Sequence, residues 1–312
     1  MQPIAIIGAG LCGLRCAEVL RHHDLPVQVF DKSRGIGGRL ATRRHRHWRF
    51  DHGCPSLHGD GAAWRQLIGG YPNWAGAMIA TGAQVPSLGI NQLAKDIGHG
   101  LNVHRECLIS DIRRAPQSWH LTNQQGELFS GFEHLIITVP APQAQALLRQ
   151  IDTPLNLELQ KTSMSPSWVM MCVTTHPLTD HAEYRPANDV IARITAEHSK
   201  PQRQCGEGEY TYVVEATPAW SAEHEEDDAT AVTQALLTAL AAVVDNSPAL
   251  LHCAVHRWRY ARTQQPLGRP FLSDAAMGLA VAGDWCVGSC ARDAYASGTA
   301  LAQHLVTDLA FG

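Results

Sequence analysis

The sequence predicts an α/β protein with a second, α+β domain, and three short stretches far apart along its 312 residues lead to that prediction. The apolar run Ile4–Ile7 is followed at once by glycines and then by a helical pattern. A glycine pair at positions 37 and 38 precedes Arg39, and an apolar run near the C-terminus ends in Gly283-Asp284. Strand, glycine turn and helix in this order are typical of a parallel sheet that binds a dinucleotide.

The first of these stretches carries the pattern Gly-x-Gly-x-x-Gly. Gly8 permits the tight turn, Gly10 lets the backbone approach a pyrophosphate, and Gly13 lets the helix pack on the strand. The phosphates then lie at the positive end of the helix, where backbone N–H groups lack partners. We therefore expect this turn, with Leu11 and Cys12 in it, to bind the cofactor.

The second stretch indicates which dinucleotide is bound. The strand Val27–Phe30 ends in Asp31, whose carboxylate can accept both hydroxyls of an adenosine ribose. The segment that follows ends in Gly37-Gly38-Arg39, which places N–H groups and a guanidinium against the cofactor's phosphates. Simple nicotinamide dehydrogenases have no counterpart to this glycine pair, so the predicted cofactor is FAD rather than NAD.

The third stretch returns the chain to the first domain. A buried strand at 278–283 ends on Asp284, and a helix is expected from about Arg292 to Leu309. In this fold class the aspartate can accept a hydrogen bond from the ribityl chain of the flavin. The helix N-terminus, pointing at the pyrimidine end of the ring, stabilises the negative charge of the reduced form.

Between these stretches the pattern indicates a meander and then an antiparallel sheet. Short strands with a turn at 123–126 predict the meander, and β-rich runs at 168–175, 190–195, 210–216 and 250–260 predict the sheet. One long helix is expected at 222–244, with the carboxylates near 223–228 at its start, and a shorter one at 88–97. The expected division is an FAD-binding domain of residues 1–57, 87–150 and 266–312 and a substrate domain of residues 58–86 and 151–265.

Composition excludes several classes of protein. The net charge of −4 and pI near 6.5 give no reason to expect nucleic acid as a partner, so the basic run 43–49 is interpreted as a solvated strand or as one that attracts an anionic ligand. The N-terminus lacks the features of a normal signal peptide, and no run is long and apolar enough to span a bilayer. The nine cysteines include no Cys-x-x-Cys pair, which favours reduced thiols in a cytoplasmic protein and predicts no metal site.

The chain resembles renalase and its bacterial relatives within the flavin amine oxidase superfamily. The resemblance rests on residues 30–39, on Asp51-x-Gly53, on Ile191-Ala192-Arg193 and Ser199-Lys200-Pro201, and on the segments 219–221, 256–261 and 283–286. It implies non-covalent FAD, a p-hydroxybenzoate-hydroxylase-like two-domain fold, and hydride oxidation with O2 as the final acceptor. For bacterial members the implied substrates are isomeric dihydronicotinamides.

The resemblance also assigns residues to the cofactor. It implies that these bind FAD: Gly8, Gly10, Leu11, Cys12, Gly13, Asp31, Lys32, Arg39, His52, Gly53, Ile109 (through its backbone, to the adenine), Asp284, Arg292, Asp293, Ala294 and Tyr295. The chain departs from the group at Cys54-Pro55-Ser56, where relatives have Ala-Gln-Tyr. Its 54–83 segment is also shorter, which changes the expected wall of the substrate cavity.

Four residues are candidates for contact with the substrate. Trp258 and Tyr260 alternate with arginines on a strand, so they share one face and are predicted to form the wall on the substrate side of the flavin. Ordinary sheet packing is the alternative for both. Arg193 and Lys200 are candidates for an anionic substrate's phosphates, with a solvated surface position as the alternative.

Three functions remain open on the sequence. The first is an oxidase that takes hydride from a dihydronicotinamide dinucleotide to flavin N5 and gives H2O2, a reaction that needs positioning more than an acid or a base. The second is a flavin amine oxidase, and the third is a protein that binds FAD without turnover. The sequence does not predict the oligomeric state.

Overall fold

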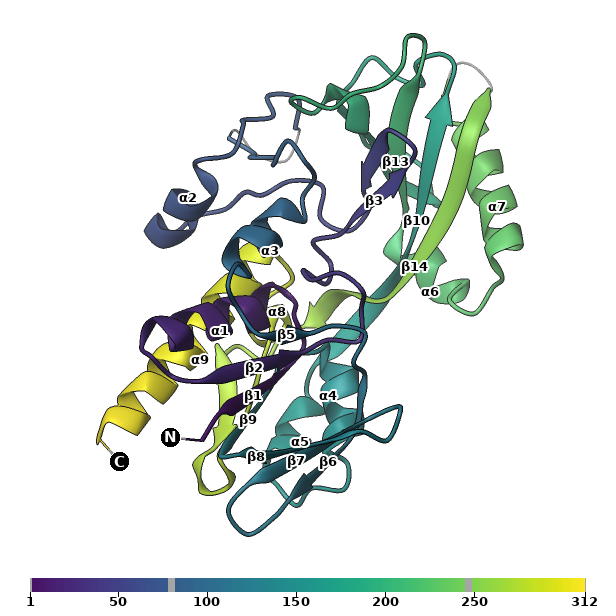
Figure 1. The fold of residues 1–312 in the computed structure, drawn as a ribbon. Coiled ribbons are helices and arrows are strands. Elements are labelled where there is room, and N and C mark those ends of the chain that lie inside the picture. Colours follow the sequence, from purple (N-terminus) through teal and green to yellow (C-terminus); the bar gives the residue numbers. More distant parts are fainter. Residues whose placement is uncertain (1, 78–81, 245–248, 312) are drawn as a thin grey trace. The chain divides into compact units, whose positions relative to one another are not determined.

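The computed structural model describes residues 2–77, 82–244 and 249–311 of the chain (Figure 1). The chain forms two compact packing units. The first unit comprises Met1–Gly38, Leu93–Met164 and Thr263–Gly312, and the second comprises Arg39–Gln92 and Ser165–Arg262. Residues 39–57 therefore pack with the second unit. The predicted division into a cofactor domain and a substrate domain stays a prediction, because it depends on bound molecules and not on packing.

The first unit is built on a mixed six-stranded sheet, whose central strand β1 is buried at every position. Its strands lie in the order β15 (Phe271–Asp274), β16 (Leu279–Ala282), β9 (His134–Ile137), β1 (Ile4–Ile7), β2 (Val27–Phe30) and β5 (Val103–His104). All neighbours are parallel except β15 and β16. Buried parallel strands require cover on both faces, and this unit supplies it.

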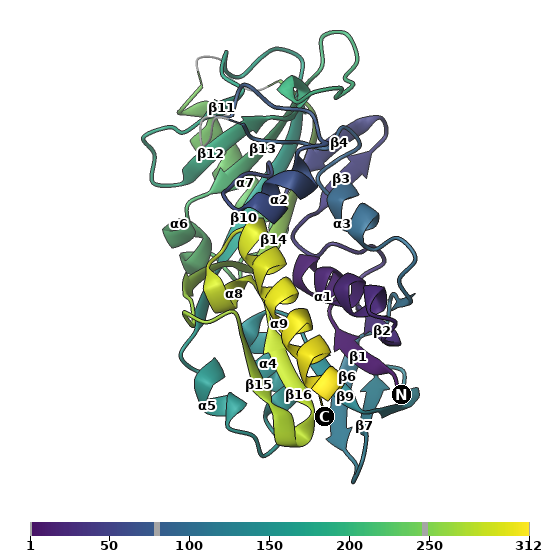
Figure 2. The same ribbon diagram turned by 90° about the vertical axis from the view of Figure 1, so that its left-hand side faces the viewer.

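Two helices lie side by side along this sheet, α1 (Leu11–His22) and α9 (Ala291–Phe311) (Figure 2). They cross closely at Gly298, where an added Cβ would overlap the carbonyl oxygen of Cys12. The Arg15 Nε donates to Thr299 Oγ1 at 2.9 Å, and the Arg15 guanidinium lies 4.7 Å from the centre of the Tyr295 ring. The first and last helices of the chain are thus fixed to each other.

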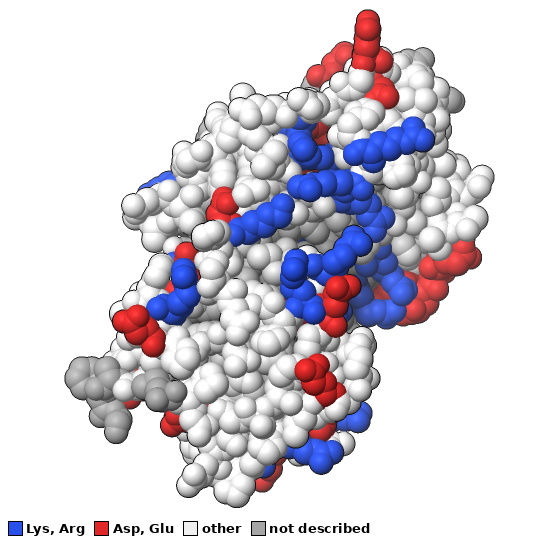
Figure 3. Space-filling view, in the orientation of Figure 1, with Lys and Arg blue, Asp and Glu red and all other residues white. Residues whose placement is uncertain are grey.

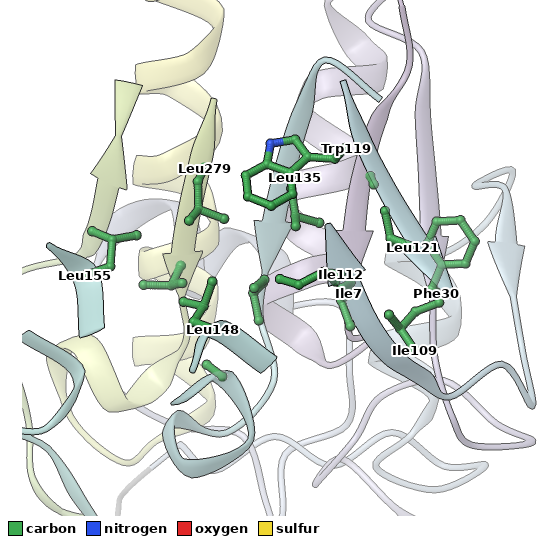
Figure 4. Packing of buried hydrophobic residues seen from close by; sticks show 14 of the residues in the cluster. Ile7, Phe30, Ile109, Ile112, Trp119, Leu121, Leu135, Leu148, Leu155 and Leu279 are labelled. Atoms are coloured by element: carbon green, nitrogen blue, oxygen red, sulfur yellow. The ribbon is translucent and has the colours of Figure 1, made fainter. Parts of the chain in front are cut away.

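A hydrophobic cluster covers the other face of the sheet (Figure 4). It joins Ile7, Leu135 and Leu279 of the sheet to Trp119 and Leu121 of the meander. The meander and two helices are β6 (Ile109–Arg114), β7 (Trp119–Asn123), β8 (Leu128–Phe132), α4 (Ala141–Leu148) and α5 (Leu155–Leu159). The Asn123 side chain accepts from the backbone N–H of Gln125 and Glu127, so the predicted turn is confirmed.

The second unit is built on a five-stranded sheet that is antiparallel, as predicted, at the pairs with defined register. Its order is β11 (Glu183–Tyr184), β12 (Ile191–Ala196), β13 (Tyr210–Ala216), β10 (Ser163–Thr174) and β14 (Leu250–Gln265). A hairpin of β3 (Thr42–His45) and β4 (Trp48–Asp51) packs Trp48 and Phe50 on one face of this sheet. The helices of this unit are α2 (Ala62–Ile68), α6 (Pro218–Glu223), α7 (Ala229–Ala241) and the short η1 (Glu197–Ser199), whereas α3 (Gln92–Ile97, from Leu93 on), η2 (Ala275–Met277) and α8 (Asp284–Val287) belong to the first unit.

Two predicted helices differ from the structure. The single helix expected at 222–244 is wrong, because the chain leaves the helical path after Glu223 and begins α7 at Ala229. The Asp228 carboxylate accepts from the N–H groups of Thr230 and Ala231 and so caps the new helix. The helix expected at 88–97 begins only at Gln92, since Gly89 has a φ of +121° that no helix contains.

Among residues 2–77, 82–244 and 249–311, none of the helices combines the length and the apolar character that crossing a bilayer would need. The same residues contain no group of three or more His, Cys, Asp or Glu side chains arranged to hold a metal ion.

Candidate functional site

The glycine turn of the first unit is shaped by close packing. Gly8 has a φ of +110°, and an added Cβ would lie 3.0 Å from the Oγ1 of Thr138. Thr138 itself hydrogen-bonds the carbonyl oxygens of Ile7 and Gly8, at 3.2 and 2.9 Å. A side chain at Gly13 would overlap the Gly8 carbonyl. Packing within the protein therefore requires glycine at positions 8 and 13, whether or not a cofactor is bound.

Packing within the protein does not require glycine at position 10. Gly10 is the N-cap of α1 with a φ of −72°, which any residue can adopt, and an added Cβ would meet nothing within 4 Å. No side chain caps the helix. Open space beside uncapped N–H groups at the N-terminus of a twelve-residue helix fits a pyrophosphate. This geometry supports the dinucleotide site predicted from the sequence.

Asp31 is bound to the same turn. Its Oδ2 accepts from the backbone N–H of Ala9 and its Oδ1 from that of Ser33, both at 2.7 Å. Each carboxylate oxygen keeps a second lone pair, so the half-buried side chain can still accept ribose hydroxyls. The Gly37 N–H donates to the carbonyl of Ala9 at 2.8 Å, which brings the second glycine stretch against the first.

Backbone hydrogen bonds bring the segment before Ile109, the residue predicted to contact the adenine, next to Asp31. Cys107 donates its N–H to the carbonyl oxygen of Asp31 at 2.9 Å, two residues before Ile109. The Ile109 side chain packs in the cluster that contains Phe30. Lys32, by contrast, is exposed. The arrangement is compatible with a backbone contact from Ile109, which stays a prediction.

The third stretch is joined to the first through one hydroxyl. The fully buried Ser297 Oγ accepts from the Gly283 N–H at 3.0 Å and from the Cys12 thiol at 3.7 Å, and donates to the Pro270 carbonyl at 2.6 Å. Burial raises the pKa of the Cys12 thiol to about 12, so this thiol stays protonated and donates. Asp284, next to Gly283, is also buried.

The start of α9 is closed by Asp293. Its Oδ2 accepts from the backbone N–H groups of Ser289 and Cys290, both at 3.0 Å, and its Oδ1 pairs with Arg292 at 3.2 Å. These bonds hold the loop that leads into residues 292–295. The Asp293 carboxylate thereby stabilises the loop before α9. The predicted flavin contacts of Arg292, Ala294 and Tyr295 stay predictions.

The second unit contains an aromatic cluster at the end of β4. His52 stacks on Trp258 with ring centres 5.3 Å apart, and the Trp258 Nε1 donates to the His52 carbonyl at 2.9 Å. His256 meets both rings edge to face, at 4.9 Å from His52 and 4.5 Å from Trp258. Tyr260, two residues beyond Trp258 on β14, is half-buried. The indole of Trp258 is thus fixed by two histidines that were not predicted, and the predicted wall on the substrate side of the flavin stays a prediction for Trp258 and Tyr260.

Both imidazoles of this cluster are neutral. Burial, followed by the nearby His256, lowers the pKa of His52 to about 4. Burial and the charge of Arg43 lower the pKa of His256 to about 4. In the described part of the chain, none of His52, His256 and Trp258 hydrogen-bonds or ion-pairs with a carboxylate. At neutral pH the cluster offers apolar and π surface, but no acid and no anion.

The Arg39–Gly53 contact holds the backbone beside this cluster. The Arg39 carbonyl accepts from the Cys54 N–H at 3.1 Å, and a side chain at Gly53 would overlap that carbonyl. The Arg39 Nη1 donates to the Ala261 carbonyl at 2.9 Å. Gly53 is thus required for packing in this unit, in addition to any contact with the flavin.

Lys200 lies inside a buried group of charges. Its Nζ is 3.1 Å from Asp51 Oδ2 and 2.5 Å from Glu197 Oε1, and the side chains of all three residues are inaccessible to solvent. Arg203 also pairs with Asp51, and Glu197 Oε2 accepts from the Asp51 N–H at 3.0 Å. Burial raises the pKa of Asp51, but Lys200 and Arg203 outweigh it, so the pKa of this carboxyl lies below its ordinary value.

Arg193 is likewise matched by carboxylates. It pairs with Glu215 on β13 and lies 3.9 Å from Glu183, and its exposed fraction is 8%. Neither Arg193 nor Lys200 has the solvated surface position that was the alternative at these sites. Their packing favours a structural task, and a contact with substrate phosphates stays a prediction.

Several functional side chains were not predicted from the sequence. Thr138 and Ser297 were missed because a hydroxyl that supports a distant turn leaves no local pattern. Asp51, Glu197 and Arg203 were missed for a similar reason, since their pairing depends on the meeting of distant segments. His256 could have been predicted, because it precedes Trp258 by two residues on the same strand and therefore shares its face.

The fold and the glycine turns define a dinucleotide-binding α/β protein, and comparison with known families gives a more specific result. Residues 6–69 match the NAD(P)-binding Rossmann-like domain, and residues 70–306 match the flavin containing amine oxidoreductase family. The second match spans well over half of the chain. The chain therefore belongs to the flavin containing amine oxidoreductase family.

Solved structures with the same fold cover the whole chain. Cyclohexylamine oxidase from Brevibacterium oxydans IH-35A has a TM-score of 0.74 at 12% identity, covering 99% of each chain. An oxidoreductase from Methanosarcina mazei has a TM-score of 0.70 at 12% identity, covering 97% of this chain and 100% of that one. Putrescine oxidase bound to putrescine has a TM-score of 0.65 at 12% identity, covering 98% and 99%. At these identities the likeness shows the fold.

Membership in the family makes the protein an FAD-dependent oxidoreductase and confirms the cofactor predicted from Gly37-Gly38-Arg39. FAD is bound non-covalently in this family generally. The open space at Gly10 and the acceptor lone pairs of Asp31 fit its pyrophosphate and ribose.

Proposed function

We propose that the protein oxidises a small reduced substrate of the dihydronicotinamide dinucleotide class by hydride transfer, with O2 as the electron acceptor. One observation carries the proposal: the cluster of His52, His256 and Trp258 is aromatic, rigid and free of carboxylate partners among the described residues. A protonated amine also binds aromatic faces, but its charge favours a carboxylate partner, which this cluster lacks among the described residues. A flat, uncharged dihydropyridine ring favours a π surface.

The residues of the chain would act on such a substrate by positioning. Trp258 is held by its bond to the His52 carbonyl and by stacking, so its ring can orient a flat substrate without loss of freedom on binding. Neutral imidazoles give up no proton near pH 7, which fits a hydride-transfer step that needs none, and solvent would supply the one proton that the formation of H2O2 consumes. FAD, when bound, supplies the hydride acceptor and returns two electrons to O2, giving H2O2.

The flavin contacts predicted for Gly8, Gly10, Asp31, Arg39 and Asp284 are part of the proposal. We propose the same for the remaining predicted cofactor ligands: Leu11, Cys12, Gly13, Lys32, His52, Gly53, Ile109, Arg292, Asp293, Ala294 and Tyr295. The support is the shape of the Gly10 turn and the hydrogen bonds that link the three stretches within the first unit.

Anaerobic mixing of the FAD-loaded protein with isomeric dihydronicotinamide dinucleotides tests the proposal. We expect at least one isomer to bleach the flavin absorbance in a single fast phase. Putrescine and cyclohexylamine serve as the comparison, because amine oxidation is the second reaction that the family supports. If amines bleach the flavin and no dihydronicotinamide does, the proposal is wrong.

Two variants at Trp258 sharpen the test. Trp258→Phe keeps a ring but loses the bond to the His52 carbonyl, while Trp258→Ala removes the surface itself. We expect KM to rise in both variants, more in Trp258→Ala, with little loss of bound FAD. Trp220→Phe is the matched control, since that indole, in α6, stacks on His224 just after the helix.

A further inference from the structure

The β3–β4 hairpin carries an unusual concentration of arginine. Arg43 and Arg44 lie on β3, Arg46 lies in the turn, and Arg49 lies on β4. The strand register places Arg44 directly opposite Arg49. Like charges at directly opposed positions destabilise a strand pair. The hairpin therefore maintains a repulsive pair on its outer face.

No carboxylate neutralises this charge within the described part of the chain. Arg43, Arg44, Arg46 and Arg49 form no ion pair there, although Arg46 lies 5.7 Å from the centre of the Trp48 ring. Figure 3 shows Lys and Arg side chains gathered over the hairpin. Other arginines of the same unit pair with carboxylates, as Arg257 and Arg259 do with Glu226. The unmatched charge is thus a particular property of the hairpin.

The acidic groups beside the hairpin are already engaged, Asp51 with Lys200 and Arg203 and Glu209 with the turn. Glu209 Oε2 accepts from Trp48 Nε1 and from His47 Nε2, both at 2.7 Å. These hydrogen bonds, with that from the Gly206 N–H, lower the pKa of Glu209 to about 2. The Glu209 carboxylate therefore stabilises the turn of the hairpin and forms no ion pair with the four arginines among the described residues.

The position of the hairpin is fixed by its other face. Trp48 and Phe50 are buried in a cluster with Val169, Met171 and Val213 of the five-stranded sheet. Strand alternation places Arg44 and Arg49 on the opposite face of the hairpin, away from this cluster. Their backbones are therefore held in place before any ligand arrives, which lowers the entropic cost of binding.

The hairpin and the aromatic cluster are neighbours within the second unit. Arg43 lowers the pKa of His52, His252 and His256, in each case after the larger effect of burial or of another histidine. His252 in turn stacks on His45 of the hairpin with ring centres 4.1 Å apart. Arg43 and His45, on the face of the hairpin that carries Phe50 and Trp48, thus bring positive charge and a ring close to the histidines of the aromatic cluster and of β14.

We propose that this arginine hairpin binds the phosphates of a dinucleotide substrate, with Arg44 and Arg49 as the phosphate ligands and Arg43 on the other face of the hairpin, the face that carries Phe50. The inference rests on the proposed function and extends it to substrate selection. A guanidinium pair matches the oxygens of a pyrophosphate, whereas four unmatched cations repel an amine. The bound phosphates would also remove the repulsion between Arg44 and Arg49.

Binding of ADP-ribose to the FAD-loaded protein tests the hairpin separately from the reaction. ADP-ribose carries the pyrophosphate but no nicotinamide, and bound FAD excludes it from the cofactor's own ADP site. We expect Arg44→Gln/Arg49→Gln to weaken binding at least tenfold in calorimetric titration and to make it less sensitive to salt. Arg65→Gln/Arg113→Gln, at two exposed arginines that pair with Asp60 and Asp111, is the matched control and should bind like the parent.

Folding of the variant can be judged independently. Removal of the opposed charges should leave the melting temperature equal to or above that of the parent. If the variant binds ADP-ribose as the parent does, or if the parent does not bind it at millimolar concentration, the inference is overturned. Tighter binding of a single-stranded oligonucleotide through the same arginines would also overturn it.

The two proposals fail in different ways. If Arg44→Gln/Arg49→Gln loses ADP-ribose binding but no dihydronicotinamide bleaches the parent's flavin, the phosphate site is supported and the proposed reaction is wrong. If dihydronicotinamide riboside, which has no phosphate, bleaches the flavin with the same KM as the dinucleotide, the reaction stands and the hairpin assignment falls.

Discussion

The Ser297 Oγ accepts the backbone N–H of Gly283 at 3.0 Å, and this bond links α9 to the turn that follows β16. The same oxygen accepts from Cys12 in α1 and donates to the carbonyl of Pro270. One buried hydroxyl thus joins the first glycine turn, the last one and the segment before β15. The predicted cofactor stretches are 270 residues apart in sequence, and their relative position within the first unit depends on this contact.

Ser297→Ala should therefore destabilise the protein and weaken FAD binding together. The Gly283 N–H and the Pro270 carbonyl would lose their partner in a buried place, which costs about 1 to 3 kcal/mol of free energy of unfolding. Urea unfolding of the apoprotein and the dissociation constant of FAD measure the two effects. Thr307→Ala is the control on the same helix, because that hydroxyl bonds only the carbonyl one turn back. An unchanged FAD affinity in Ser297→Ala would show that the contact serves stability alone.

The glycine turn permits a test in which two similar changes give opposite results. Gly10→Ala should fold normally, since the added methyl meets no protein atom and the φ of −72° suits alanine. We expect it to lose FAD affinity at least tenfold, because the methyl occupies the space assigned to the pyrophosphate. The apoprotein melting temperature and the flavin content after gel filtration are the measurements.

Gly13→Ala is the companion change. Its methyl would overlap the Gly8 carbonyl, so α1 must move away from β1 and the apoprotein itself should lose several kcal/mol of stability. A stable Gly13→Ala apoprotein, or a Gly10→Ala protein that retains the parent's flavin, would contradict this account of the turn.

The contrast between these glycines and Ser297 explains how far the sequence could predict the fold. The strands at 4–7, 27–30 and 210–216 were predicted with correct bounds, because their apolar runs and flanking turns are local features. The break between α6 and α7 was not, since the residues of 222–244 are good helix formers and the break depends on the Asp228 cap and on Arg257 and Arg259 of a distant strand. The buried ion pair of Lys200, predicted as a phosphate contact with a solvated surface position as the alternative, was missed for the same reason, because its partner Asp51 is 149 residues away.

Lys200→Met tests whether that lysine is structural. Removal of its charge leaves Glu197 and part of Asp51 without compensation in a buried place, which should cost about 3 to 5 kcal/mol. Lys161→Met, at an exposed pair with Glu158, is the control and should change stability by less than about 1 kcal/mol. Urea unfolding with excess FAD measures both.

A second substitution separates charge from packing at this place. Lys200→Met/Glu197→Gln removes one charge of each sign, so it should recover a substantial part of the stability lost in Lys200→Met. Recovery with an unchanged KM would assign Lys200 to the fold. If Lys200→Met keeps the parent's stability while KM for the substrate rises, the earlier prediction that Lys200 meets the substrate's phosphates would instead be supported.

The paired imidazoles of His52 and His256 give the protein a defined response to acid. Both have a pKa of about 4 in the folded state, below the ordinary histidine value of about 6.5. Between these two pH values the unfolded chain binds protons that the folded protein does not, so the free energy of unfolding must fall as the pH falls. The loss begins near pH 6.5 and is complete below pH 4.

His256→Gln should make the free energy of unfolding depend less on pH. We expect the variant to lose less stability than the parent between pH 7 and pH 4.5, by about 1 kcal/mol, a value reduced for the partial exposure of the ring. His22→Gln, at an exposed position near the end of α1, should follow the parent. Urea unfolding at a series of pH values with excess FAD gives the comparison. Parallel curves for the parent and His256→Gln would mean that the pKa of His256 is the same in the folded and the unfolded chain, so the cluster would gain charge just below neutral pH and would lack the uncharged surface on which the proposed function rests.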